Sequence, residues 1–74
     1  MSEHIVSLNG YRLGQRVEAR EVYSPVWRPA VIDSFTTHRD GPGCYLHWLD
    51  VDPGDLSKSQ GGWQPLSAIR EVAP

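Results

Sequence analysis

Glycine and proline interrupt this chain so often that they decide what it can fold into. Seven glycines and six prolines fall among its 74 residues, and both residue types favour turns over regular helix. Nowhere do apolar residues recur over a long stretch at the three- and four-residue spacing of an amphipathic helix. The sequence therefore predicts one all-β domain built from short strands.

The first firm strand is predicted at residues 15–22, where apolar and charged residues alternate. Val17 and Ala19 fall on one face, and Arg16, Glu18 and Arg20 fall on the other, which is the period of a half-buried strand. Further strands are predicted at residues 27–35, 44–49, 62–64 and 69–72. Alternation puts Ala30 and Ile32 on one face of the second strand, and Leu46 and Trp48 on one face of the third. Pro29 cannot donate a ladder hydrogen bond, so we expect the second strand to be an edge strand or to carry a bulge near its start.

Turn residues mark the connections between these strands. Residues 36–43 contain Asp40-Gly41 and Pro42-Gly43 and predict a hairpin loop. Residues 50–61 predict a long polar loop, and residues 65–68 a single helical turn. The expected organisation is a flexible leader at 1–10, which ends at the turn signal Asn9-Gly10, a barrel domain at 11–72, and a tail at 73–74.

Length and composition limit the size of the core and the cellular locations that we expect for the domain. A domain of this size buries only about 60% of its unfolded surface, so its core is thin. Cys44 is the single cysteine and excludes a disulfide framework. No apolar run is long enough for a secretory signal or a membrane span. We therefore expect a cytoplasmic protein (nuclear in a eukaryote) that is a monomer or a weak dimer, without membrane association.

Four segments together resemble a known group of domains. In chain order they are Leu13-Gly14-Gln15-Arg16-Val17-Glu18-Ala19-Arg20, Trp27-Arg28-Pro29-Ala30-Val31-Ile32, Tyr45-Leu46-His47-Trp48 and Trp63-Gln64-Pro65-Leu66-Ser67-Ala68-Ile69-Arg70. This set resembles the Tudor and chromo-barrel group of SH3-like barrels. The resemblance implies a bent five-stranded barrel with one helical turn before the last strand. Closure into a barrel would also remove exposed sheet edges.

The same resemblance implies an aromatic cage for a methylated lysine or arginine. A cation that hydrogen-bonds poorly is attracted to aromatic ring faces. We therefore predict a non-catalytic module that binds a peptide, such as one with a methylated side chain. The predicted ligand-binding residues are Tyr23, Trp27, Trp48, Asp50 and Asp52.

Other interpretations of these rings stay open. The tryptophans could form the core of a thin barrel, and the resemblance gives Trp63 a packing role. Residues 50–55 depart from the group because they lack the further aromatics that complete a cage.

An adaptor without a cage is the alternative function. It would bind a protein or a nucleic acid through a sheet edge or through an arginine face. That face comprises Arg12, Arg16, Arg20 and Arg28, and neighbouring aromatics could stack on bases. Glu18 and Glu21 interrupt the face, and the net charge of −2 opposes a dedicated nucleic-acid role.

Catalytic and metal-binding functions receive little support. The tail also resembles small plasmid-type dihydrofolate reductases, but Gly61-Gly62-Trp63-Gln64 stands where those enzymes carry Val-Gln-Ile-Tyr. A Cys44 nucleophile would lack a third, orienting group, and the three histidines lack zinc spacing. We interpret residues 50–55 as a solvated loop, not a calcium site, and we expect no enzyme activity, no metal and no cofactor.

Overall fold

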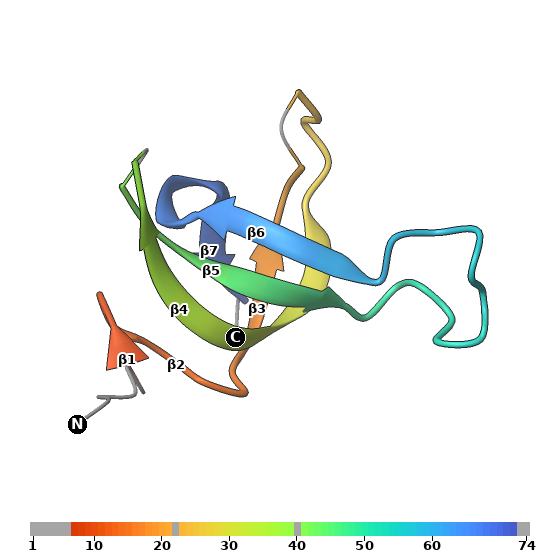
Figure 1. Cartoon of the computed structure of the whole chain (residues 1–74), viewed down its shortest axis with the longest axis horizontal. Coiled ribbons are helices and arrows are strands. Elements are labelled where there is room, and N and C mark those ends of the chain that lie inside the picture. Colours follow the sequence, from red (N-terminus) through yellow and green to blue (C-terminus); the bar gives the residue numbers. More distant parts are fainter. Residues whose placement is uncertain (1–6, 22, 40, 73–74) are drawn as a thin grey trace.

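The chain folds into two antiparallel sheets in a computed structural model that describes residues 7–21, 23–39 and 41–72 (Figure 1). The elements are β1 (Ser7–Leu8), β2 (Tyr11–Arg12), β3 (Arg16–Ala19), β4 (Arg28–His38), β5 (Gly41–Trp48), β6 (Gly61–Pro65), the 3-10 turn η1 (Leu66–Ala68) and β7 (Ile69–Glu71). β1 pairs with β2, and the other strands form one sheet in the order β6-β5-β4-β3-β7. The predicted all-β class, with five main strands and one helical turn before the last, is confirmed.

The N-terminal hairpin turns at Asn9-Gly10. Both residues have positive φ, 51° and 86°, and β1 pairs with β2 across them, as a two-residue hairpin turn requires. Residues 7–10 of the predicted leader thus belong to a hairpin. The rest of the leader and the predicted tail at 73–74 lie outside the described residues.

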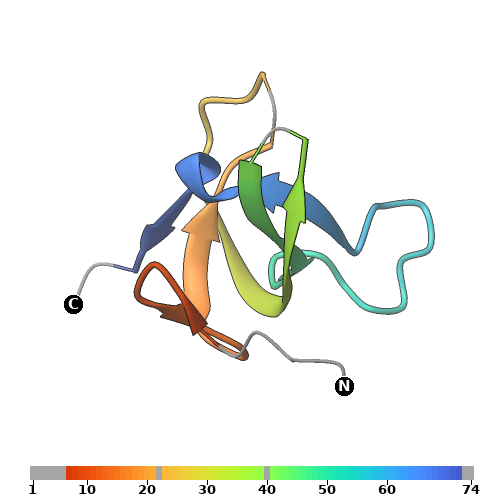
Figure 2. The same ribbon diagram turned by 60° about the vertical axis from the view of Figure 1, so that its left-hand side comes forward.

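The core lies on the inner face of the curled five-stranded sheet (Figure 2). Alternation places one side chain in two on this face, and the predicted pairs Val17/Ala19, Ala30/Ile32 and Leu46/Trp48 are all buried. Among the described residues, the buried apolar cluster comprises Val17, Ala19, Ala30, Ile32, Phe35, Cys44, Leu46, Trp48, Val51 and Ile69. Strand alternation alone was therefore sufficient to predict most of the core.

Pro29 occupies a place that the sequence did not predict. Its strand, β4, is the central strand of the sheet, between β3 and β5, so the predicted edge position is wrong. A residue with an N–H at position 29 would donate it close to Trp48, where β5 ends. Proline, which lacks this N–H, is therefore tolerated there. Its carbonyl still accepts a 3.0 Å hydrogen bond from the Leu49 N–H. The register shift of β4 lies between Ile32 and Ser34, not near the proline.

The predicted loop at residues 36–43 is largely strand. β4 continues to His38 and β5 begins at Gly41, with Thr36 opposite Gly43 and Thr37 opposite Pro42. β-branched threonines favour the extended chain. Glycine is required at position 43 by packing and not by a turn, because a Cβ there would lie 2.3 Å from the Trp63 ring. The Trp63 Nε1–H donates a 2.9 Å hydrogen bond to Thr36 Oγ1, which ties β6 to the far end of β4.

The long loop between β5 and β6 is ordered by its own polar side chains. Asp52 accepts a hydrogen bond from the Gly54 N–H, and Asp55 accepts one from the Ser57 N–H. The Gln60 side chain donates to the carbonyls of Asp52 and Asp55. Such carboxylates mimic backbone turns, so the predicted polar loop is confirmed. No helix in the described ranges has the length and apolar character needed to cross a membrane.

Candidate functional site

An arginine covers the most deeply buried tryptophan. Arg28 shares the inner-face parity of Ala30 and Ile32 on β4, and Ala30 lies opposite Trp48 on β5. Arg28 is therefore a diagonal neighbour of Trp48. Its guanidinium carbon lies 4.1 Å from the centroid of the Trp48 ring. Trp48 itself is only 3% exposed.

Two carboxylates hold this guanidinium in place. Arg28 Nε and Nη2 each donate a 2.8 Å hydrogen bond to one oxygen of Asp50, and Nη1 donates to Glu21. The hydrogen bond from Arg28 keeps the pKa of Asp50 below its ordinary value, and the bond to Asp50 raises the pKa of Arg28. One cation thus faces two anions, so the Arg28–Asp50–Glu21 cluster carries a net charge of about −1 near neutral pH.

A hollow opens beside this cluster, over the inner face of β6. We call it the small hollow; its volume is about 300 Å³, and its lining consists of Glu21, Trp48, Ser59, Gly61, Gly62 and Gln64. The space exists because β6 offers no side chain at Gly62, where an added Cβ would meet nothing within 4 Å. At Gly61, by contrast, a Cβ would lie 1.9 Å from the Leu46 carbonyl oxygen.

Gln64 forms one wall of the small hollow and is only 9% exposed. Its Oε1 is buried and accepts no hydrogen bond from the described residues. A buried polar atom without a partner costs roughly 1–3 kcal/mol. Such a group is rare in folded proteins and calls for an explanation.

The small hollow also contains further acceptors. Glu21 contributes a carboxylate. The Ser59 hydroxyl donates its proton to the Gly61 carbonyl at 2.8 Å, which leaves the Oγ lone pairs available. The lining therefore suits a group that is rich in N–H donors.

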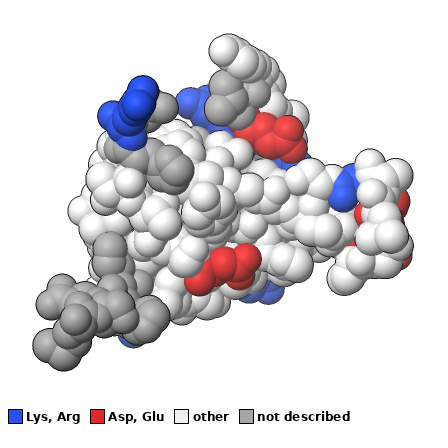
Figure 3. Space-filling model, viewed as in Figure 1, with Lys and Arg blue, Asp and Glu red and all other residues white. Residues whose placement is uncertain are grey.

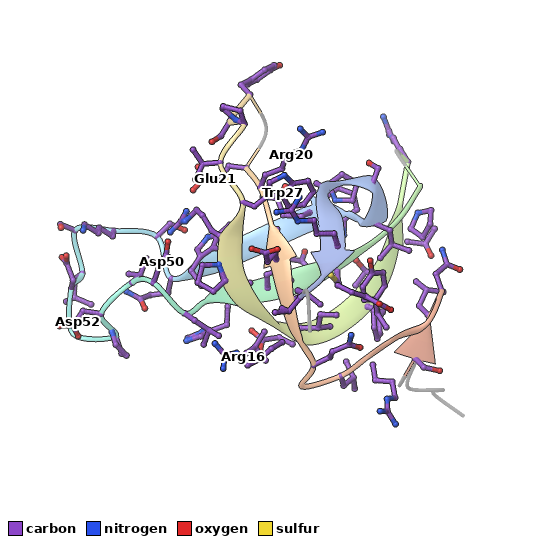
Figure 4. All side chains as sticks on the ribbon, turned by 180° about the vertical axis from the view of Figure 1, so that it is seen from behind. Arg16, Arg20, Glu21, Trp27, Asp50 and Asp52 are labelled. Carbon is purple, nitrogen blue, oxygen red and sulfur yellow. The ribbon has the colours of Figure 1, made fainter. Side chains whose placement is uncertain are left out.

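A second tryptophan, Trp27, is contacted by two arginines, one of which, Arg20, is labelled beside it in Figure 4. The guanidinium carbons of Arg20 and Arg70 lie 5.3 Å and 4.1 Å from the centroid of the Trp27 ring. Arg70 Nε also donates a 3.0 Å hydrogen bond to Glu18. For Arg20, the described residues supply no ion-pair partner.

A larger groove begins at Arg20 and runs between the β3–β4 loop and η1. Its volume is about 480 Å³, and it is lined by Arg20, Glu21, Tyr23, Ser24, Pro25, Pro65, Ser67 and Ala68. Tyr23 is fully exposed and has a φ of 70°, a backbone conformation that is unusual for a bulky residue.

The structure does not bring the three predicted cage rings to one point. Tyr23 lines the larger groove, Trp48 lines the small hollow, and Trp27 lines neither. Trp48 and Asp50 are brought together, but the cation between them is Arg28 of the same chain. Asp52 lies farther along the β5–β6 loop (Figure 4).

The predicted arginine face is also divided. Arg28 points inward onto Trp48, whereas Arg12, Arg16 and Arg20 are exposed. Glu18 lies between Arg16 and Arg20 on the outer face of β3 and accepts a hydrogen bond from Arg70. The opposite side of the molecule, seen in Figure 3, is mostly uncharged, with small acidic and basic groups at its margins.

The Cys44 thiol is buried and unreactive. Cys44 is fully buried, and burial raises the pKa of its thiol to about 11. The thiol is therefore protonated near neutral pH, whereas the thiolate is the nucleophile. Across the described ranges, no three His, Cys, Asp or Glu side chains gather as metal ligands would.

Sequence reasoning missed several residues of the small hollow. Glu21, Ser59, Gly62 and Gln64 were not singled out as ligand-binding residues. Two signals were nevertheless present. Gln64 has the same inward parity as its cross-strand partner Cys44, and a glutamine at a core-facing strand position needs hydrogen-bond partners. The adjacent Gly61 and Gly62 leave much of that strand without side chains.

Comparison with known proteins adds no assignment. No protein-family model, no curated protein and no solved structure matches this chain.

Proposed function

We propose that this protein is a non-catalytic binding module that holds a cationic side chain of a peptide in the small hollow. The proposed architecture is an SH3-like barrel of the Tudor and chromo-barrel type. Two features support closure: η1 connects the two edge strands β6 and β7, and the Arg20 N–H donates a 3.1 Å hydrogen bond to the Ala68 carbonyl.

The observation that carries the proposal is the unpartnered Oε1 of Gln64. A buried acceptor is costly when empty and strongly favours a ligand that donates to it. Gln64 lines the same hollow as Glu21 and Trp48. A guanidinium or ammonium group supplies several N–H donors and would satisfy the acceptors of the hollow.

Charge supports the same class of ligand. The Arg28–Asp50–Glu21 cluster has two carboxylates for one guanidinium. A monocation in the small hollow would bring the local charge to zero. An anionic ligand would instead add to the net negative charge of this cluster, which opposes its binding in the small hollow.

The preferred methylation state of the bound side chain can also be predicted. A quaternary ammonium group has no N–H to donate and depends on open aromatic faces, but Arg28 already covers one face of Trp48. The proposed preference is therefore for lysine or arginine side chains that retain at least one N–H, including partly methylated ones.

The test uses fluorescence polarisation with labelled 12-residue peptides that contain lysine, arginine, their methylated forms, or norleucine in their place. The account predicts binding of the N–H-bearing cationic peptides. Gly62→Leu should abolish this binding, because the leucine fills the small hollow. Leu56→Ala, at an exposed position of the β5–β6 loop, is the control and should bind like wild type.

Two results would contradict the proposal. Equal binding of the cationic and norleucine peptides would remove the role of charge. Unchanged binding by a folded Gly62→Leu variant would place the ligand elsewhere.

A further inference from the structure

The guanidiniums of Arg20 and Arg70 both contact the Trp27 ring, but of the two only Arg70 has an acidic partner among the described residues. Arg70 is stacked on the ring and also paired with Glu18 at 3.0 Å. Arg20 is stacked on the same ring at 5.3 Å, and its guanidinium has no acidic partner among residues 7–21, 23–39 and 41–72. Its five N–H groups are therefore held in place and available for a ligand.

The larger groove, into which Arg20 opens, is lined by hydrogen-bond donors. Tyr23, Ser24 and Ser67, which carry hydroxyls, are among its lining residues. The Ser24 oxygen accepts the Val26 N–H at 3.2 Å, so the serine proton can be donated into the groove. The one carboxylate in the lining, Glu21, is engaged by Arg28. This chemistry is the reverse of that in the small hollow, which is lined by acceptors.

We propose that the larger groove binds the carboxylate of an acidic peptide side chain, with Arg20 as its charged anchor and the groove hydroxyls as further donors. A guanidinium matches a carboxylate with two parallel hydrogen bonds. The stack on Trp27 reduces the side-chain entropy that such binding would otherwise cost. This subsite extends the proposed function but rests on different residues, so either site can fail without the other.

Glu21 lies at the boundary between the two sites, since it lines both the larger groove and the small hollow. A single peptide that occupies both would carry its acidic and basic side chains close together. The inference thus specifies the partner as a peptide of mixed charge, in contrast to a uniformly basic one.

The charge pattern favours a peptide over a nucleic acid. A phosphate backbone needs a continuous run of basic groups. Glu18 of β3 separates Arg16 from Arg20, which follows the strand, and Glu21 comes next in the chain. The overall net charge is −2. An isolated oxyanion next to Arg20 is compatible with this pattern, whereas a chain of phosphates would meet these carboxylates.

The experiment measures binding by fluorescence polarisation with four sets of labelled 12-residue peptides. One set contains lysine or arginine, one contains aspartate or glutamate, one contains both, and one contains neither. Wild type should bind the mixed-charge set most tightly. Arg20→Gln should weaken binding of the acid-containing peptides about tenfold, the effect of losing one charge-assisted hydrogen-bonded pair.

Matched variants separate the Arg20 effect from general damage. Arg16→Gln removes an exposed arginine from β3, the strand that ends directly before Arg20, and should leave binding unchanged. Arg20→Lys keeps the charge and should restore part of the affinity. Replacing the peptide's acidic residue by glutamine should have little further effect in Arg20→Gln, because the two changes remove one interaction.

Three outcomes of these measurements would support or overturn the inference about Arg20. Loss of the acidic preference in Arg20→Gln, with the lysine or arginine preference intact, supports the inference; this holds even if the cation site of the proposed function fails. An equal loss in Arg16→Gln would overturn it. Tighter binding of a 20-nucleotide DNA, single- or double-stranded, than of any peptide set, lost in Arg20→Gln, would also overturn it in favour of phosphate recognition.

Discussion

Arg28 lies over Trp48, with its guanidinium carbon 4.1 Å from the ring centroid, and donates two 2.8 Å hydrogen bonds to Asp50. Trp48 and Asp50 are two of the residues that the sequence predicted to hold an external cation. They already hold an internal one. In the proposed function, the external cation therefore binds beside this stack, in the small hollow lined by Gln64.

Arg28→Lys tests the structural role of this stack. Lysine keeps the charge but cannot form two parallel hydrogen bonds or lie flat on the indole. We expect the free energy of unfolding to fall by about 1–2 kcal/mol, measured by urea denaturation. Arg16→Lys, at an exposed position on β3, is the control and should change stability by less than about 0.5 kcal/mol. Equal effects of the two changes would contradict the account.

Asp50→Asn tests the electrostatics of the same pair through pH. The pKa of Asp50 is lowered in the folded protein from 3.8, chiefly by the hydrogen bond from Arg28. Its carboxylate therefore stabilises the folded state above that value, and this contribution is lost as the pH falls through the lower, folded pKa. The stability difference between wild type and Asp50→Asn should be constant from about pH 7 to 5 and shrink below about pH 4. A difference that persists unchanged at pH 2 would count against the pair.

The adjacent residues Gly61 and Gly62 differ in whether they have room for a side chain. An added Cβ at Gly61 would lie 1.9 Å from the Leu46 carbonyl oxygen, whereas one at Gly62 enters open space. We expect Gly61→Ala to destabilise the fold by about 2 kcal/mol and Gly62→Ala to change stability by less than about 0.5 kcal/mol. Thermal unfolding of the two variants provides the comparison, and equal melting temperatures would refute the local geometry of β6.

Cys44 offers a probe of the core. Burial, with a smaller contribution from Asp33, raises the pKa of its thiol to about 11. At pH 8 only about one thousandth of such a thiol is ionised, and the side chain is inaccessible besides. Iodoacetamide should therefore alkylate Cys44 slowly in buffer and rapidly in urea. Similar rates in both solvents would show that the core opens readily.

Much of the fold could be predicted from local pattern. The alternation around Val17 and around Leu46 fixed the core faces, and Asn9-Gly10 marked a turn that the structure contains. The errors arose where partners far apart in sequence decide the outcome. Pro29 is tolerated in a central strand because β5 happens to end beside it. Residues 36–43 are mostly strand because Gly43 makes room for the Trp63 ring.

The candidate site was harder to predict for a related reason. The aromatic residues can be identified in the sequence, but whether a ligand can reach a ring depends on the long, flexible side chains that cover it. Arg28 and Arg70 cover Trp48 and Trp27, and no local pattern states this. Gln64 was overlooked because its significance lies in a missing partner, which only the packed structure reveals.

Gln64→Met tests the central claim most directly, because methionine keeps the shape of glutamine but removes the unpartnered Oε1. If Gln64 serves a ligand, the variant should gain about 1 kcal/mol of stability, since a buried unsatisfied acceptor is lost. It should also lose its preference for lysine and arginine peptides over norleucine peptides. The decisive measurement is peptide affinity and urea stability on the same preparation. A variant that is no more stable than wild type and still prefers the cationic peptides would contradict the account.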